Sequence, residues 1–399
     1  MRELFRKEEE CCGCMACKSI CPKGAIRVIN DPYGYCYPKI DEDLCVDCRR
    51  CLKICPMRQQ YDEMKEVSSL AVKAKEKTIV QQSSSGGVFG VLAEQILKKK
   101  GVVFGAVMNS DWTVCHRPAE SLEELKNLQG SKYVQSNMGD CYQLCSGYLN
   151  QGREVLYVGT PCQIAGLKRF LGGDSPFLHT IDLICHGVPG NQMFQDYMKH
   201  LENRKNIQII YFCFRDKRGG WNKNGSITYV RKGRWVEKKI YASESSYYHF
   251  FDKGILLRKS CYNCPFAGGE RQGDLTIGDF WGIETALLSL SSNKIWNQPA
   301  GISCVLVNTD KGERLVDKAN EHIYKYPCKV DRKKQGALKA AVTQPLLHEQ
   351  VMEAYRKSGY EGVEKIYRSL AAKERHMSRW KAYVPDSLKI LLKRYVSRQ

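Results

Sequence analysis

Hydrophobic and polar positions along the chain change their pattern at about residue 62. From residue 68 to about 325, short apolar runs such as EVLYVG (154–159) alternate with amphipathic segments such as GGVFGVLAEQILKKK (86–100). Short apolar runs between Gly and polar residues are typical of buried strands, and a 3.6-residue apolar period is typical of helices. The alternation therefore predicts a mixed α/β (α+β) domain over residues 63–335.

The first 62 residues have little helical pattern. The segment GAIRVINDPYGYCYPKI (24–40) alternates apolar and polar residues around a Pro-Tyr-Gly turn, which predicts a small hairpin. The charged segment YDEMKEV (61–67) then leads into the next domain. We therefore expect residues 1–62 to form a small separate domain.

The last part of the chain, residues 336–399, is predicted to be a basic helical tail. In PDSLKILLKRYV (385–396), the apolar side chains fall on one helical face and the basic ones elsewhere. Such a helix either packs on its own domain or docks on a partner or a membrane surface. No apolar leader follows Met1 and no run of about 18 uncharged apolar residues occurs, so we expect a cytoplasmic protein without a membrane span.

Ten of the 20 cysteines lie between residues 11 and 55. The pattern C-x2-C-x2-C-x3-C-P occurs there twice, displaced by 34 residues, which indicates a duplicated half-domain. This spacing is typical of a bacterial ferredoxin with two [4Fe–4S] clusters, in which the fourth cysteine of each run binds the other cluster. Cluster one is assigned to Cys11, Cys14, Cys17 and Cys55, and cluster two to Cys45, Cys48, Cys51 and Cys21. A pair of zinc sites does not require this arrangement. Cys12 and Cys36 are left over and are assigned to packing.

The chain has 62 basic and 43 acidic residues, a formal net charge of +19. Each cubane with four thiolates lowers this by about 2, and a basic surface remains. Such a surface attracts acidic redox proteins, nucleic acid or anionic lipid. No nucleic-acid-binding module is recognisable, so we expect no nucleic-acid partner.

A Ser/Gly-rich loop precedes the amphipathic segment at residue 88. Ser85, Gly86 and Gly87 would present free N–H groups at a helix start, which favours a phosphate group, although an ordinary helix cap has the same pattern. The segment GSKYVQS (130–136) adds Ser131, Lys132 and Tyr133, whose groups suit a pyrophosphate or a flavin ring. Most lysines are instead solvated surface residues. The turns GDFWG and RGGWNKNG line a substrate pocket or serve only as tight turns.

Four further cysteines lie at positions where cysteines can bind metal or act as nucleophiles. Cys162 follows a predicted strand and begins a helix, Cys185 ends a strand, and Cys261 and Cys264 form a C-x2-C loop. Strand ends converge at one edge of an α/β sheet, so these four could bind a third cluster or a zinc ion. Alternatively, Cys162 is a nucleophile activated at a helix N-terminus, or the cysteines only pack.

Several motifs together carry a resemblance to a known family. They are SSSGGVFG (83–90), GSKYVQS (130–136), YVGTPCQIAGLKRF (157–170), IDLICHGVPG (181–190), LRKSCYNCPFA (257–267) and DLTIGDFWG (274–282). Together they resemble the family formed by the β-subunits of coenzyme F-420 (deazaflavin) hydrogenases and dehydrogenases, over roughly residues 1–325. The resemblance implies FAD, with Ser85, Gly86 and Gly87 as part of its site. A lysine such as Lys132 near the ring would stabilise the anionic reduced flavin through its fixed positive charge. It also implies a third [4Fe–4S] cluster held by Cys162, Cys185, Cys261 and Cys264.

The expected function is therefore that of an iron–sulfur flavoprotein oxidoreductase. Clusters move single electrons and a flavin can collect two, so the chain would pass electrons to a hydride-accepting small molecule, a deazaflavin or another acceptor. The expected donor is reduced ferredoxin or a redox partner subunit. The alternative is a non-catalytic electron-transfer subunit of a larger complex.

Overall fold

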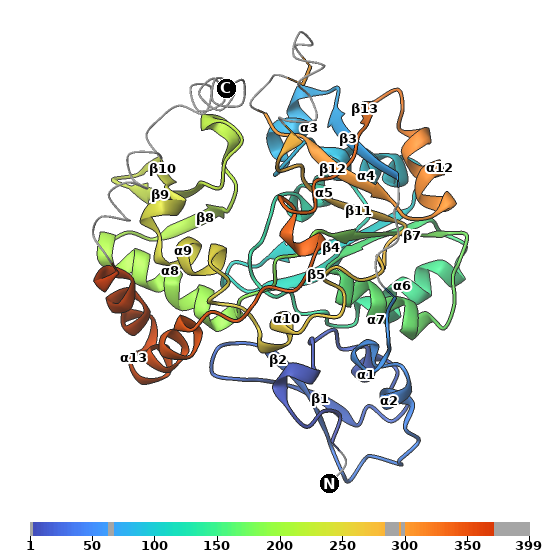
Figure 1. Cartoon of the computed structure of the whole chain (residues 1–399), viewed down its shortest axis with the longest axis horizontal. Coiled ribbons are helices and arrows are strands. Elements are labelled where there is room, and N and C mark those ends of the chain that lie inside the picture. Colours follow the sequence, from blue (N-terminus) through green and yellow to red (C-terminus); the bar gives the residue numbers. More distant parts are fainter. Residues whose placement is uncertain (1–2, 63–67, 284–294, 297–299, 371–399) are drawn as a thin grey trace.

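The computed structural model describes residues 3–62, 68–283, 295–296 and 300–370. Among these residues, eight strands form one mixed sheet in the order β13-β3-β12-β11-β7-β6-β4-β5 (Figure 1). The strands are β3 (Ser68–Ala74), β4 (Val102–Met108), β5 (Val114–Ala119), β6 (Val155–Gly159), β7 (Leu178–Leu183), β11 (Leu275–Asp279), β12 (Ser303–Val307) and β13 (Ile323–Pro327).

The centre of this sheet is parallel. Strands β4, β6, β7 and β11 run in the same direction, and antiparallel strands flank them on both sides. Parallel strands need covered faces, which explains the continuous apolar runs that predicted them. The mixed α/β architecture expected from the sequence is therefore confirmed.

Helices cover both faces of the sheet. Val103 and Leu156 point to the face covered by α3 (Lys77–Gln82), α4 (Val88–Lys98), α5 (Leu122–Leu128) and α12 (Asp310–Lys318). Their neighbours Val102 and Tyr157 point to the opposite face, covered by α1 (Ala16–Ser19), α6 (Cys141–Asn150) and α7 (Pro161–Leu171). The period-2 alternation of strand side chains thus divides the core into two apolar layers.

A second, three-stranded antiparallel sheet has the order β10-β9-β8. Its strands are β8 (Ile209–Cys213), β9 (Gly225–Arg231) and β10 (Arg234–Ile240), and it lies beside α8 (Asn191–Lys205), α9 (Ser246–Asp252) and α13 (Leu347–Ser369) (Figure 1). These elements share one aromatic core, which includes Phe194, Phe212, Tyr247 and Tyr360. The first helix of the predicted basic tail, α13, is therefore part of a packed core.

The cysteine-rich segment contains the predicted hairpin, formed by β1 (Ile26–Asn30) and β2 (Cys36–Ile40). Two short helices, α1 and α2 (Arg50–Lys53), lie beside it, and the remaining short elements are α10 (Lys259–Tyr262) and the 3₁₀ turns η1 (Glu8–Glu10), η2 (Pro56–Arg58), η3 (Lys217–Gly219), η4 (Ala242–Glu244) and η6 (Gly336–Leu338). The hairpin prediction is confirmed.

The hairpin turn closes the N-terminus of α8. The carbonyl oxygens of Tyr33 and Gly34 accept hydrogen bonds from the backbone N–H groups of Met193 and Asn191, at 3.3 Å each. N–H groups in the first turn of a helix have no partner within the helix, so the hairpin supplies one. A side chain at Gly34 would lie 2.1 Å from the Gln192 nitrogen, so only glycine permits this approach. The cysteine-rich segment is thus packed tightly against the rest of the chain.

No helix among the described residues is long and apolar enough to cross a membrane. The amphipathic segment 385–396 lies outside the described residues.

Candidate functional site

The duplicated cysteine runs have a duplicated backbone. Gly13 and Asp47 have φ values of 71° and 52°, and Met15 and Arg49 have φ values of 60° and 56°. Each pair is separated by the same 34 residues that separate the cysteine runs. Residues with positive φ turn the chain sharply, so each run turns directly before a four-residue helix that contains its third cysteine. The helix then carries the fourth cysteine away.

The structure brings Cys55 to the first run rather than to its own. Burial raises the pKa of the Cys17 thiol, and the neighbouring Cys11 and Cys55 raise it further. Cys14 has Cys17 and Cys55 as neighbours in the same way. This grouping supports the crossed ligand set for cluster one, which stays a prediction.

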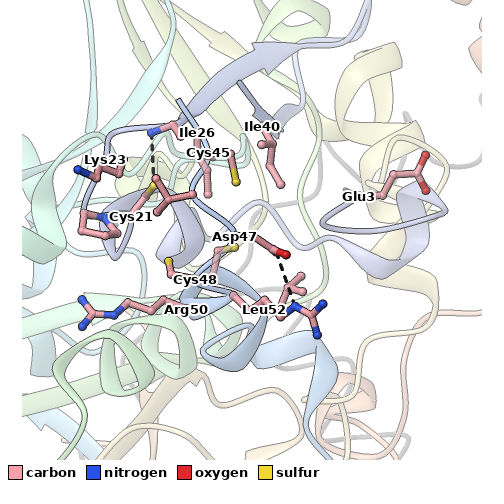
Figure 2. A pocket seen from close by; sticks show the side chains of 15 residues that line it. Glu3, Cys21, Lys23, Ile26, Ile40, Cys45, Asp47, Cys48, Arg50 and Leu52 are labelled. Atoms are coloured by element: carbon pink, nitrogen blue, oxygen red, sulfur yellow. Dashed lines mark hydrogen bonds and ion pairs between the residues drawn. The ribbon is translucent and has the colours of Figure 1, made fainter. Parts of the chain in front are cut away.

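The second group surrounds a cavity of about 190 Å³ on the outer side of the segment. Cys21 lines this cavity together with Cys45, Cys48 and Cys51, and Figure 2 shows the first three side chains around it. The Cys21 sulfur accepts a hydrogen bond of 3.3 Å from the Ala25 nitrogen. Cys48 is exposed, so this group opens to solvent.

A second cavity, of about 50 Å³, is lined by all four cysteines predicted to bind the third cluster: Cys162, Cys185, Cys261 and Cys264. Cys162 is the second residue of α7, directly after β6, and Cys185 follows the adjacent parallel strand β7. Cys261 lies in α10, and Cys264 lies just beyond that helix. Segments about 100 residues apart in the sequence thus meet at the carboxyl edge of the parallel strands, as expected for an α/β sheet.

The four cysteines of this third group are partly buried. Burial raises the pKa of Cys185 to about 12 and that of Cys264 to about 11. A hydrogen bond with Cys12 and burial raise the pKa of Cys162 well above its usual value. A nucleophile at a helix N-terminus needs a lowered pKa, so the environment of Cys162 opposes that alternative.

Among the described residues, no group of three or more His, Cys, Asp and Glu side chains could hold a single metal ion. In a cubane each thiolate binds a different iron, so its ligands stand farther apart than those of one ion.

Cys12 has a position that the sequence analysis did not anticipate. Its thiol is hydrogen-bonded to both Cys14 and Cys162, and it lines the same cavity as the third group. It therefore lies between the ligands predicted for cluster one and for the third cluster. Cys36, by contrast, is buried in an apolar cluster, which agrees with a packing role.

The residues that we expected to bind the flavin lie in and next to the Ser84–Gly87 loop. The Ser131 nitrogen and hydroxyl both donate to the Ser84 hydroxyl, at 2.8 and 2.7 Å, and the hydroxyls of Ser85 and Ser303 are 2.9 Å apart. A side chain at Gly86 would lie 2.3 Å from the Val72 carbonyl oxygen. Gly87 has a φ of 91° and precedes α4. Both glycines are thus required by packing and by backbone conformation, with or without a cofactor.

Lys132 is not a solvated surface lysine. Its ammonium donates to the carbonyl oxygens of Asn127 and Gln129, at 2.9 and 2.8 Å. Burial lowers its pKa to about 7. Tyr133 stacks on Phe251 with ring centroids 4.7 Å apart, and its hydroxyl accepts a hydrogen bond from Arg215.

Two basic residues at this loop were missed by the sequence analysis. Lys217 donates to the carbonyl oxygens of Ser85 and Ala300, at 2.6 and 2.8 Å, and burial followed by the nearby Arg215 lowers its pKa to about 7. Arg215 pairs with Asp279 at 2.6 Å. The available signal was the basic run RDKR directly after an apolar strand. Both side chains reach residues far away in the sequence, so that signal did not specify their role.

The two tryptophan-containing turns meet at the same place. Trp221 and Trp281 stack with centroids 4.9 Å apart, and the Trp221 indole N–H donates to Asp279 at 2.7 Å. These turns are therefore joined into one structure beside Arg215, Lys217 and the Ser84–Gly87 loop.

Comparison with protein families gives three matches along the chain. Residues 69–141 match the N-terminal model, and residues 152–332 the C-terminal model, of the coenzyme F420 hydrogenase/dehydrogenase beta subunit. Residues 37–61 match a 4Fe-4S binding domain, which includes the second cysteine run.

Curated relatives agree with this result. The chain is 24% identical to the beta subunit of the coenzyme F420 hydrogenase of Methanococcus voltae, over 64% of this chain and 81% of the relative. It is 26% identical to the coenzyme F420-dependent sulfite reductase of Methanocaldococcus jannaschii, over 76% of this chain and 45% of that protein. It is 26% identical to a subunit of the F(420)H(2) dehydrogenase of Methanosarcina mazei, over 39% of this chain and 47% of the relative. The chain thus spans less than half of the last two relatives.

Proposed function

We propose that this chain is an iron–sulfur flavoprotein that reduces or oxidises a small molecule by hydride transfer. The premise is that the chain belongs to the family of coenzyme F420 hydrogenase/dehydrogenase beta subunits. Two clusters in residues 1–62 and a third at the carboxyl edge of the sheet would exchange single electrons, and FAD would couple them to a two-electron step. The substrate is a deazaflavin or another hydride acceptor of similar size.

A single observation carries this proposal. Cys162, Cys185, Cys261 and Cys264 line one cavity, and Cys12, next to the ligands proposed for cluster one, lines the same cavity. Four thiols from three separate segments provide the ligand number of a cubane. Their position beside the ferredoxin-like segment suits a relay into the larger domain.

The residues around the Ser84–Gly87 loop suit an anionic cofactor. Two lysines there, Lys132 and Lys217, are held by backbone carbonyls and have pKa values lowered by burial. An ammonium that is partly removed from water is stabilised by an anion, such as the pyrophosphate of FAD. The stacked tryptophans beside Arg215 would shape the pocket for the isoalloxazine ring or the substrate.

Iron analysis of the full chain, purified without oxygen, tests the proposal. We expect about twelve irons and about twelve sulfides per chain, together with flavin that is released on heating. The Cys185→Ala variant should retain about eight irons, because one cubane loses a ligand. The Cys328→Ala variant is the matched control and should retain about twelve, since Cys328 lines neither cavity. A wild-type protein with about eight irons, or with no releasable flavin, would contradict the proposal.

A second candidate function is electron transfer within a larger complex. Two of the relatives are named as subunits, which favours a partner subunit as the donor or acceptor of electrons. The purified chain distinguishes the two candidates: an electron-transfer subunit would hold its clusters but would not reduce a free deazaflavin without its partner.

A further inference from the structure

One arginine is buried at the boundary between the cysteine-rich segment and the main domain. The Arg258 side chain, just before α10, has no exposed surface. Its Nε donates to the Cys11 carbonyl oxygen at 2.8 Å, and its Nη1 donates to the Gln135 Oε1 at 3.0 Å. The guanidinium lies over the Tyr37 ring, 4.0 Å from its centroid. Arg258 thus connects the two parts of the chain.

Within the described part of the chain, Arg258 has no carboxylate at ion-pair distance. Its Nη2 is buried and has no hydrogen-bond partner. The other two buried arginines among the described residues differ in this respect, because Arg215 pairs with Asp279 and Arg271 pairs with Asp182, each at 2.6 Å. A buried charge without a counter-charge is strongly unfavourable, so a negative group is expected beside Arg258.

The groups nearest to this charge are thiols. Arg258 acts electrostatically on Cys11, Cys12 and Cys261. The backbone also joins Arg258 to the third set, because the Cys261 nitrogen donates to the Arg258 carbonyl oxygen at 2.8 Å. Cys11 belongs to the set proposed for cluster one, whereas Cys162 and Cys261 belong to the third set. The cation therefore lies between two proposed clusters.

We propose that Arg258 is an electrostatic positioning residue that raises the reduction potentials of cluster one and of the third cluster together. The inference rests on the ligand sets of the proposed function. Reduction adds a negative charge to a cluster, and a fixed cation in a low-dielectric interior stabilises the reduced form. Cysteine thiolates bound to iron would provide the negative counter-charge that is otherwise missing beside Arg258. One cation acting on both clusters shifts both potentials in the same direction.

Redox titration of the intact holoprotein, followed by electron paramagnetic resonance, tests this role. In Arg258→Met, the midpoint potentials of two clusters should shift to more negative values at unchanged iron content. In Arg258→Lys, which keeps the charge, they should return toward the wild-type values. The solvent-open cluster of Cys21, Cys45, Cys48 and Cys51 is the internal control and should not shift. Unchanged potentials in Arg258→Met, with all irons retained, would overturn the proposal.

A second variant tests the same charge if Arg258→Met does not fold. Gln135→Glu places a carboxylate at the atom that accepts from Arg258 and leaves the arginine packing in place. It should shift the same two potentials in the same negative direction, and an absence of shift would again overturn the proposal. A wild-type protein that lacks the third cluster would instead contradict the proposed function. The effect of Arg258 on the potential of cluster one, through Cys11, would still be measurable in that protein.

Discussion

At the scale of single residues, the chemistry of this chain depends on charges removed from water. Arg258 is fully buried and Lys132 and Lys217 are partly buried, and all three contact mainly carbonyl oxygens, rings or thiols. Removing a positive charge from water is unfavourable when no anion lies near it. The cost is offset when an anionic group binds nearby. The positions of these side chains therefore support the anionic cofactors proposed above.

For Lys132, we predict that charge neutralisation weakens FAD binding. Lys132→Met should raise the FAD dissociation constant roughly ten- to hundred-fold, because a charge-assisted hydrogen bond contributes about 1.5–3 kcal/mol. Lys132→Arg should bind nearly as well as the wild type, and Lys126→Met, a change on the exposed side of α5, should have no effect. Fluorescence titration of the deflavinated protein measures these constants. Equal constants for all three variants would show that Lys132 does not face the cofactor.

The pH dependence of FAD binding follows from the same residues. The pKa values of Lys132 and Lys217 are lowered to about 7, so both ammoniums are charged below pH 7 and lose their protons as the pH rises. FAD affinity should fall above pH 7, by up to about tenfold per pH unit for each lysine that binds the cofactor. In Lys132→Arg the fall should be less steep, because arginine does not titrate in this range. An affinity that is constant from about pH 6 to about pH 9 would contradict a pyrophosphate site here.

At the scale of secondary-structure elements, two short helices determine which cysteines share a cluster. Helices α1 and α2 contain four residues each, and each one leads from the third to the fourth cysteine of its run. The helix is too short to stabilise itself and is maintained by the backbone turns before it and by packing. Its length moves Cys21 and Cys55 out of their own loops and towards the other loop.

The crossed arrangement predicts the outcome of paired substitutions. Cys14→Ala with Cys55→Ala removes two ligands from the same cluster, so about eight of about twelve irons should remain. Cys48→Ala with Cys55→Ala removes one ligand from each of two clusters, so about four should remain. Iron and sulfide analysis of the two double variants decides between the assignments, because ligand sets without crossing predict the opposite order.

At the scale of the whole molecule, the cysteine-rich segment is part of the core of the protein. Tyr35 and Tyr37 belong to the aromatic core of the small sheet, and Met15 and Ala16 belong to the layer beneath α7. The hairpin also closes the N-terminus of α8. Buried contacts of this extent leave little freedom of movement between the two parts, so the proposed electron exchange between them would not require a docking motion.

The charge of the whole chain predicts how a donor approaches. The solvent-open cavity is lined by three basic residues (Lys23, Arg49 and Arg50) and two acidic ones (Glu3 and Asp47), and the formal net charge of the chain is +19. Reduction by an acidic ferredoxin should therefore slow several-fold as ionic strength rises from about 0.05 to about 0.3 M. Arg49→Gln with Arg50→Gln should slow it at low salt, whereas Arg234→Gln, on the distant strand β10, should not. Stopped-flow absorbance measures the rates, and identical rates in both variants would exclude entry at this cavity.

The 4Fe-4S binding domain, the hairpin and the strands of the sheet were predictable because their signals are local. Cysteine spacing restricts which thiols reach one cluster, and apolar runs identify buried strands without knowledge of their partners. Even the meeting of Cys162 and Cys185 followed from a general property of parallel strands. That these cysteines bind a third cluster remains a prediction.

Other features depended on contacts between residues distant in the sequence. Arg258 and Cys11 are 247 residues apart, and Arg215 and Asp279 are 64 apart. From the sequence, Cys12 was assigned to packing, and only the folded structure shows its thiol hydrogen-bonded to Cys162. Burial and electrostatic partners are properties of the assembled core, because each depends on every segment that packs around a side chain. Local patterns therefore identified the elements and the candidate ligands, and folding determined which charges lie beside them.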